Sequence, residues 1–315
     1  MRKQIIELCF VLLAVFVLGC STDQSGKTAP GDSSLDTQFV DTDAVSGSVA
    51  DIDAPSTLPP IDDYSDFGPF EFTHETGTGP DGTYTIVRPK TLGVLGEDRF
   101  LHAPIIFGPG IGGAPSSMMP LLERIASHGF VIISKTLNGG PGNPENNRRM
   151  IDGLDWLIAQ NTTTGSMFEG KLAVDHAISM GYSVGGTAAV DVGGHDAIVT
   201  VVSIHGHGAK PIEESSATFL LMGGTRDIMR DGQSWLAPTY EALEAQTFFS
   251  LVEGADHGYI TRTLNGVQGG VETPAMIAWI RYWVYNDEEA KKYFYGDDCI
   301  MCKSPWANTQ RKNWE

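Results

Sequence analysis

Positively charged residues are scarce in this sequence of 315 residues. Lys and Arg number 21 against 39 Asp and Glu, which gives a formal net charge of −18 at pH 7. So acidic a chain is a poor match for a phosphate backbone or an anionic lipid surface, and we expect no nucleic-acid partner. The hydrophobic share of 41% is ordinary for a soluble globule, and the length suits one large α/β domain or two small ones.

Cysteine is also scarce, with four residues in the chain. Cys299 and Cys302 form a Cys-x-x-Cys spacing, which occurs in redox motifs and in half of a zinc site. No second Cys or His pair accompanies it, and no thioredoxin-like βαβ pattern precedes it. Because an exported protein meets an oxidising compartment, we expect a local disulfide between these two cysteines and no metal site.

The other two cysteines lie in an N-terminal segment with the pattern of a secretory signal. A short basic start, MRKQ, precedes the apolar run IIELCFVLLAVFVLGC, which is too short and wrongly flanked for a membrane-spanning helix. Val17–Cys20 resembles a bacterial lipobox, with a leucine before Gly19 that departs from the commonest form. We expect residues 1–19 to be cleaved off, with Cys9, and Cys20 to carry lipid.

The predicted lipid would anchor the protein to the outer membrane of a Gram-negative cell, since serine rather than aspartate follows at position 21. Periplasmic or secreted protein and an uncleaved anchor are the alternatives. Residues 20–64 are rich in Ser, Thr, Asp, Pro and Gly, and they hold too few large apolar residues to fold. We expect a disordered acidic tether over 20–64 and one folded domain, a monomer, over 65–315.

Within 65–315, apolar runs of strand length alternate with segments that have helical patterns. An antiparallel pair is predicted at 68–75 and 82–89. Further strands are predicted at 103–108, 130–136, 176–182, 197–204, 217–224 and 246–254, and helices at 115–127, 147–160, after Ser183, at 232–245 and at 272–286. This alternation predicts an α/β fold, with a mostly parallel central sheet and helices on both faces.

Ser183 lies in the stretch HAISMGYSVGGTAAV, which is a strand followed by Gly-x-Ser-x-Gly and a helix of small residues. This is the context of a nucleophile elbow, in which a sharp turn presents the serine oxygen at the carboxyl end of a sheet. The five-residue pattern alone is weak, because Gly and Ser are common in turns. In this setting it predicts that Ser183 is a nucleophile.

A serine nucleophile needs a base, and in this fold the chain order is serine, then acid, then histidine. His195 follows the elbow helix directly, whereas His205 and His207 end the next strand, too early to leave room for an acid-bearing strand. His257, in EGADHGY, follows the last predicted strand of the alternating pattern. We therefore predict His257 as the base.

The acid that orients this histidine should come from the end of the preceding strand. The stretch ATFLLMGGTRD delivers Asp227 to that position, and Asp231 is the second candidate. Asp256 is too close to His257 in the sequence to be its partner.

An ester hydrolase also needs two backbone N–H donors that face the developing alkoxide. Val184, after the nucleophile, should supply one, and Ile111 in the loop FGPGIGGAPSSM should supply the other. The same loop fits the dinucleotide pattern Gly-x-Gly-x-x-Gly over 108–113. Because the next strand ends at Lys135 rather than at an acidic ribose ligand, we expect no cofactor.

With these residues assigned, the sequence resembles the bacterial cutinase-like polyester hydrolases. These include the poly(ethylene terephthalate) hydrolases, and the related dienelactone-hydrolase and chlorophyllase-like esterases share the same α/β-hydrolase fold. The resemblance covers about 68 to 290 and depends on GPGIGGAPSSMMPLLERIASHGFVII, GLDWLIAQN, GYSVGG, LLMGGTRD, EGADHGY and AMIAWIRYWVYND.

The resemblance implies the same nucleophile, acid, base and oxyanion donors: Ser183, Asp227, His257, Ile111 and Val184. It implies a serine carboxylic-ester hydrolase that acts through an acyl-enzyme on small esters or polyesters. An acyl or carbohydrate esterase and a non-catalytic ligand-binding lipoprotein are the alternatives.

The sequence departs from the family at three substrate-binding positions. Ile111 stands where the polyester hydrolases usually carry an aromatic residue, and His207 stands where they have a tryptophan. Tyr182 precedes the nucleophile in place of Trp or His. The first two changes predict a weaker grip on aromatic ester units.

Overall fold

Strands and helices alternate along most of the computed structural model, which describes residues 56–208, 215–229, 232–264 and 270–314. The strands of these residues are β1 (Phe72–Thr78), β2 (Tyr84–Pro89), β3 (Val94–Leu95), β4 (Asp98–Arg99), β5 (Pro104–Gly108), β6 (Val131–Ser134), β7 (Ala177–Tyr182), β8 (Ile198–Ile204), β9 (Thr218–Gly224), β10 (Thr247–Val252) and β11 (Trp306–Lys312). The α-helices are α1 (Met119–Ser127), α2 (Pro144–Gln160), α3 (Val184–Asp191), α4 (Gly232–Ala242), α5 (Tyr259–Thr263) and α6 (Glu272–Tyr285). Short 3-10 helices are η1 (Pro115–Met118), η2 (Val174–His176), η3 (Glu288–Tyr293) and η4 (Ile300–Cys302).

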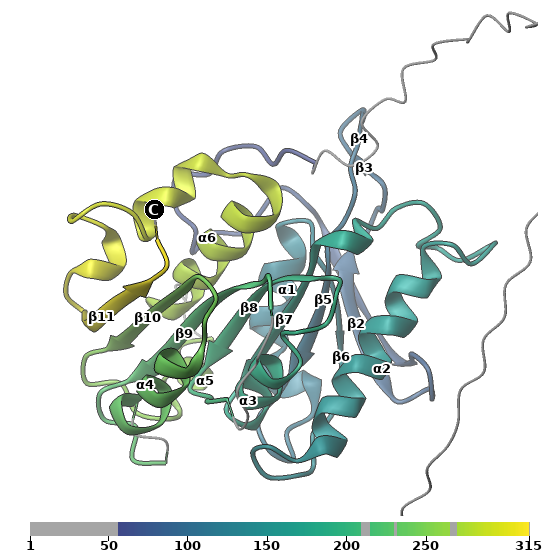
Figure 1. The fold of residues 1–315 in the computed structure, drawn as a ribbon. Coiled ribbons are helices and arrows are strands. Elements are labelled where there is room, and N and C mark those ends of the chain that lie inside the picture. Colours follow the sequence, from purple (N-terminus) through teal and green to yellow (C-terminus); the bar gives the residue numbers. More distant parts are fainter. Residues whose placement is uncertain (1–55, 209–214, 230–231, 265–269, 315) are drawn as a thin grey trace, which may run out of the picture. The chain divides into compact units, whose positions relative to one another are not determined.

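Nine of the strands form one sheet in the order β1-β2-β6-β5-β7-β8-β9-β10-β11 (Figure 1). From β6 to β10 each neighbouring pair is parallel. At the edges, β1 pairs with β2, β2 with β6, and β11 with β10, all antiparallel. The predicted α/β fold with a mostly parallel sheet is confirmed.

The sheet is buried on both faces, which explains why its strands are apolar throughout rather than alternating. Along β5, Ile105 and Phe107 belong to one hydrophobic cluster, while Ile106 between them belongs to a second one. Helices α1 and α6 contribute to the first cluster, and α2, α3 and α4 contribute to the second. In Figure 1, α2, α3 and α4 lie in front of the sheet.

Two elements differ from the sequence-based expectation. Helix α2 begins at Pro144, because the side chain of Asn143 caps it by accepting a hydrogen bond of 2.9 Å from the Glu145 N–H. Strand β11 was not predicted, since its sequence WANTQRK is largely polar. A strand at the edge of a sheet needs few apolar side chains, so the hydrophobic pattern gave little sign of it.

The predicted tether also extends too far, because the segment before residue 65 is packed against the domain. Tyr64 is fully buried and Leu58 is 6% exposed. The guanidinium of Arg281, in α6, donates a hydrogen bond of 2.7 Å to the Pro59 carbonyl. A few apolar residues suffice to bind a polar segment to an existing core, which composition alone does not reveal.

None of the helices in the described ranges has the length and apolar character of a membrane-spanning segment. The predicted signal peptide (1–19), the lipidated Cys20 and the tether up to residue 55 lie outside the described residues.

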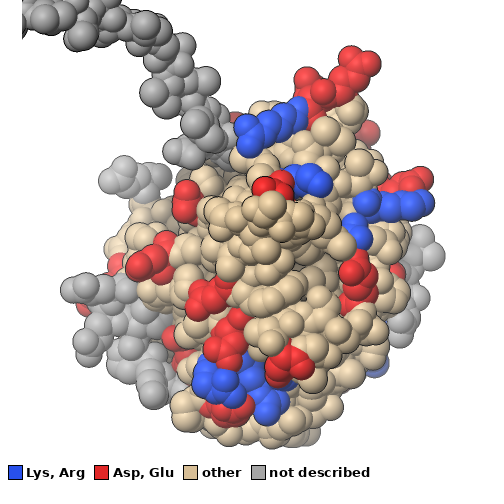
Figure 2. All heavy atoms as spheres, turned by 90° about the vertical axis from the view of Figure 1, so that its right-hand side faces the viewer, with Lys and Arg blue, Asp and Glu red and all other residues tan. Residues whose placement is uncertain are grey.

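Basic side chains of the described residues are few and largely paired. Figure 2 shows one face of the molecule, on which most Lys and Arg side chains sit in small groups beside Asp and Glu. On α2, for example, Arg148 contacts Glu145 at 2.7 Å and Asp152 at 2.5 Å. On this face a polyanion would therefore meet small groups of paired charges rather than a broad basic surface.

Candidate active site

Ser183 lies at the turn between β7 and α3, near the centre of the sheet. Its φ of 56° and ψ of −118° are strained for a residue with a side chain. The turn needs glycine around it. A Cβ at Gly185 would lie 1.8 Å from the Gly108 carbonyl oxygen, and one at Gly181 would lie 2.2 Å from the Gly185 carbonyl oxygen. These contacts give the Gly-x-Ser-x-Gly pattern a steric reason in this chain.

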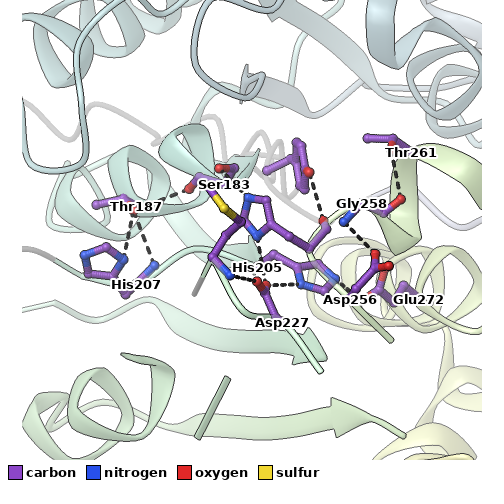
Figure 3. A network of polar contacts seen from close by, with 12 residues as sticks. Ser183, Thr187, His205, His207, Asp227, Asp256, Gly258, Thr261 and Glu272 are labelled. Atoms are coloured by element: carbon purple, nitrogen blue, oxygen red, sulfur yellow. Dashed lines mark hydrogen bonds and ion pairs between the residues drawn. The ribbon is translucent and has the colours of Figure 1, made fainter. Parts of the chain in front are cut away.

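The structure brings the predicted base and acid to Ser183 from the ends of two other strands. His257 follows β10, and its Nε2 lies 2.8 Å from Ser183 Oγ. Its Nδ1 lies 2.8 Å from Oδ2 of Asp227, which follows β9 and is 2% exposed. Met229 N–H donates to the other carboxylate oxygen at 3.1 Å. Three residues far apart in the sequence thus form one hydrogen-bonded chain (Figure 3).

The two predicted oxyanion donors, Val184 and Ile111, lie on separate backbone segments that line the cavity of Ser183. Val184 is the first residue of α3, so its N–H has no partner one turn earlier in the helix. Ile111 lies in the loop after β5 and is 59% exposed. Both line the same cavity as Ser183, which is the arrangement that the sequence predicts for the two donors.

That cavity has a volume of about 460 Å³ and is bounded mainly by apolar side chains. It is lined by Gly110, Ile111, Gly113, Ser117, Met118, Pro141, Tyr182, Ser183, Val184, Met229, His257 and Thr261. Ile111 and Met229 are both more than half exposed, so apolar surface continues from the cavity to its rim. An apolar acyl group therefore fits the wall better than a charged one.

Tyr182 and His207 were both predicted to bind substrate, and the structure separates them. Tyr182 lines the cavity, and its hydroxyl donates a hydrogen bond of 2.8 Å to the His257 carbonyl. His207 does not line the cavity. Its ring is 9% exposed and packs against Trp235 of α4, with 4.7 Å between the ring centroids. The structure places His207 beside Thr187 of α3 and Trp235 of α4, outside the lining of this cavity.

Two residues at this site were missed by the sequence reasoning, His205 and Glu272. His205 Nδ1 lies 2.8 Å from Asp227 Oδ2, and its Nε2 lies 2.9 Å from Glu272 Oε1 at the start of α6. His205 was set aside because it precedes the acid in the chain. The carboxyl ends of the adjacent parallel strands β8 and β9 nevertheless bring it beside Asp227, which is the signal that could have identified it.

His205, Asp227 and His257 offer ligand atoms within 4.8 Å of one another, a grouping that could also hold a cation. The contacting atoms of each residue are already engaged with one another or with Ser183 and Glu272. Hydrogen-bonded histidine and carboxylate pairs of this kind can transfer protons and stabilise charge.

The rival dinucleotide motif has a structural explanation. A Cβ at Gly108 would lie 2.7 Å from Gly185 Cα, so this glycine lets the elbow pack against β5. Lys135, just after the strand that follows this loop, forms an ion pair with Asp81 and lies over the Tyr84 ring. The loop therefore serves the serine site.

Cys299 and Cys302 are joined by a disulfide. Asp231, the second candidate for the acid, lies outside the described residues.

Comparisons with known proteins identify the family of this chain. The PET hydrolase-like family profile matches residues 90–310. Cutinase est1 of Thermobifida alba is 25% identical over 227 residues, which are 70% of this chain and 72% of the relative. Cutinase 2 of Thermobifida cellulosilytica is 26% identical over 231 residues, 70% of this chain and 82% of the relative.

A further relative is the bis(hydroxyethyl) terephthalate hydrolase of Streptomyces coelicolor, 24% identical over 194 residues, which are 60% of this chain and 59% of the relative. The family match extends from β3 nearly to the end of β11 and includes every residue of the serine site. The chain therefore belongs to the PET hydrolase-like family, a family of serine ester hydrolases with the α/β-hydrolase fold.

Proposed function

We propose that this protein is an extracytoplasmic carboxylic-ester hydrolase that acts on polyesters or small esters through Ser183, His257 and Asp227. The observation that carries the proposal is the unbroken chain of contacts from Ser183 Oγ through His257 to Asp227, each 2.8 Å long. It opens onto an apolar cavity that suits the acyl part of an ester.

In the proposed reaction, His257 Nε2 takes the hydroxyl proton as Ser183 Oγ attacks the ester carbonyl carbon. The carbonyl π electrons move to oxygen, where the N–H groups of Ile111 and Val184 bind the negative charge. His257 then gives its proton to the leaving alcohol as the C–O bond breaks, which leaves an acyl-serine. Water repeats the sequence and releases the acid. Asp227 stays ionised and stabilises the charged imidazole in both halves.

A fluorophosphonate probe, which phosphonylates activated serines, tests the nucleophile directly. Wild-type protein should be labelled and Ser183→Ala should not, while the control Ser116→Ala, at an exposed serine outside the cavity lining, should label at the wild-type rate. Labelling of Ser183→Ala, or no labelling of the wild type, would refute the proposal.

The substrate range follows from the cavity wall. Ile111 supplies an aliphatic side chain where its relatives in the resembled family carry an aromatic one, so flexible aliphatic chains should be held better than a terephthalate unit. Incubation with an aliphatic and an aromatic polyester film, with released acid measured, tests this order. Faster release from the aromatic film contradicts it.

The proposed location is the outer membrane, through lipid on Cys20. The supporting observation is the lipobox-like Val17–Cys20 after an apolar run. Fractionation of cells should find the wild type with the membrane and Cys20→Ser released or mislocalised. Unchanged membrane association of Cys20→Ser would contradict lipid anchoring.

A further inference from the structure

Asp227 contacts a second histidine that takes no part in the proposed reaction. Figure 3 shows the His205 ring between Asp227 and Glu272, with one ring nitrogen toward each carboxylate. The same oxygen, Asp227 Oδ2, lies 2.8 Å from Nδ1 of both His205 and His257. The side chains of His205, Asp227 and Glu272 are all fully buried.

The number of protons in this buried group follows from its contacts. Two nitrogens that face two carboxylates need one proton in each hydrogen bond. His205 is therefore either a cation between two carboxylates, or a neutral ring that accepts a proton held by Glu272. In both arrangements His205, Asp227 and Glu272 together carry one negative charge, the same as an isolated aspartate.

Stability alone does not account for this arrangement. Buried ion pairs are often no better for stability than apolar residues of similar size. His205 also adopts a left-handed φ of 51°, a strained conformation for a non-glycine residue. Glu272 Oε2 is buried with no hydrogen-bond partner among the described residues. Strain and an unsatisfied carboxylate oxygen next to a reactive group are typical of functional sites.

We propose that His205, held by Glu272, is a positioning residue for Asp227 that fixes its carboxylate and sets the lower pH limit of ester hydrolysis. This inference rests on the proposed function of Ser183, His257 and Asp227. His205 touches neither substrate nor serine, and it acts through the oxygen that it shares with His257.

The surroundings of His205 favour its charged form. Burial of the ring acts against the charge, but the Glu272 charge and the hydrogen bonds with Asp227 and Glu272 outweigh it and raise the pKa of His205 to about 9. The rings of Tyr182 and His257 are also near, at 6.3 and 5.7 Å between centroids.

Two further charged groups of the described residues lie near the site, Asp256 beside His257 and Arg262 on α5. They pair with each other at 2.8 Å. Their opposite charges offset each other.

The sign of the effect on His257 follows from the order of the charges. The positive charge of His205 lies next to Asp227 and nearer to His257, whereas the charge of Glu272 lies behind it. We therefore expect His205 to hold the acid limb of the activity profile at lower pH than aspartate alone would. At an effective dielectric constant of about 20, such a difference corresponds to a shift of about one pH unit.

The test is the pH profile of kcat/KM of the full chain on 4-nitrophenyl butyrate, from about pH 5 to about pH 9. Glu272→Gln keeps the shape of the side chain but removes the charge that holds His205 protonated. The acid limb should move up by about one pH unit, with little change on the plateau above it. An unmoved limb, a downward shift, or an equal loss at every pH would overturn the proposal.

A second variant keeps the test valid if Glu272→Gln does not fold. The double variant His205→Asn plus Glu272→Gln retains an amide donor toward Asp227, and asparagine tolerates the left-handed φ. It removes the same charge, so the acid limb of its pH profile should lie about one pH unit above that of the wild type. If the acid limb of the kcat/KM profile of the double variant coincides with that of the wild type, the proposal is overturned.

Two controls separate this proposal from the proposed function. Asp155→Asn removes the carboxylate partner of an unrelated histidine, His195, which it contacts at 2.9 Å, and should leave the profile unchanged. A shift in Asp155→Asn would overturn the assignment of the effect to the Asp227 group. Activity that survives in Ser183→Ala would overturn the proposed function itself, whereas an inactive Ser183→Ala with a wild-type limb in Glu272→Gln overturns the role of His205 alone.

Discussion

The two histidines on either side of Asp227 have the same contact and different surroundings. Each places Nδ1 2.8 Å from Asp227 Oδ2. The other nitrogen of His257 meets Ser183 Oγ at the cavity, and its side chain is 18% exposed. The other nitrogen of His205 meets Glu272 in full burial. One ring can exchange a proton with a reacting group, while the other is held as a fixed charge.

A histidine–aspartate contact does not by itself identify a base. What decides the role is the group at the far nitrogen and whether substrate can reach it. Chain order predicts His257 rather than His205 as the base. It gave no sign that His205 would contact the acid at all.

The two histidines should differ most in how far their replacement lowers kcat. We expect His257→Ala to lower kcat by about 10⁴-fold or more, because no base remains for Ser183. We expect His205→Asn to lower it by less than about tenfold on the plateau, because the base and Asp227 remain. Steady-state kinetics on a short acyl ester measures both. Similar losses in the two variants would contradict the assigned roles.

The losses in kcat caused by mutations in the proposed triad should not be additive. Ser183→Ala plus His257→Ala should cost little more than either single change, because each already removes the same step. Additive losses in kcat would count against a shared role for the two residues.

A change on the cavity side should alter substrate preference and leave the pH profile unchanged. Ile111→Tyr adds an aromatic ring that can stack on the ring of an aromatic diester. An aromatic pair contributes roughly 0.5–1.5 kcal/mol to binding beyond the burial of apolar area. We therefore expect kcat/KM on an aromatic diester to rise by up to about tenfold, more than on an aliphatic ester. Equal gains on both substrates would show that Ile111 does not face the acyl group.

A smaller effect is expected from Tyr182→Phe, which tests how the base is held. The change removes the hydrogen bond of 2.8 Å to the His257 carbonyl but keeps the ring, which lies 5.3 Å from the His257 ring. One hydrogen bond of about 1 kcal/mol corresponds to a loss of roughly fivefold in kcat. Tyr240→Phe, a tyrosine of α4 outside the cavity lining, is a control that should keep the wild-type kcat.

The smallest expected effect is that of His205, the fully buried histidine beside Asp227, on the pH dependence of thermal stability. The pKa of His205 is raised from 6.5 to about 9, so its stabilising contribution is complete below pH 6.5 and is lost as the pH rises through about 9. Thermal unfolding should show Tm falling by on the order of a few degrees over that interval, and Glu272→Gln should flatten this fall. An alkaline fall of equal size in Glu272→Gln would contradict the assignment.

On the acid side, two other buried histidines should act in the opposite direction. Burial lowers the pKa of His102 to about 4, and burial with the nearby Arg281 charge lowers that of His128 to about 3. Both prefer to be neutral in the folded state, so stability should fall as the pH drops below 6.5 toward these values. Replacing His102 by Gln should lessen the acid fall in Tm, and an unchanged fall would contradict its role.

Much of the fold followed from local sequence patterns. Continuous apolar runs predicted the strands of the parallel core, because strands covered on both faces need apolar side chains at every position. The edge strand β11 was missed because it pairs through backbone hydrogen bonds and carries polar side chains. Burial of Tyr64 was missed because its neighbours in the sequence are those of a linker.

The sequence by itself determined the elements of the serine site. Gly-x-Ser-x-Gly between a strand and a helix, with an acid and then a histidine after later strands, is a pattern of residues near in sequence and in fixed order. Such patterns can be recognised because steric needs, such as the glycine at 185, act on each residue locally.

Only the tertiary structure decided which side chains share Asp227 and which line the cavity. His205 and Glu272 are 67 positions apart, and their contact arises from the meeting of strand β8 with the first turn of α6. His207 turns to Trp235 rather than to the cavity. Both outcomes depend on how helices pack over the ends of strands, and that packing is set by the whole core rather than by any one segment.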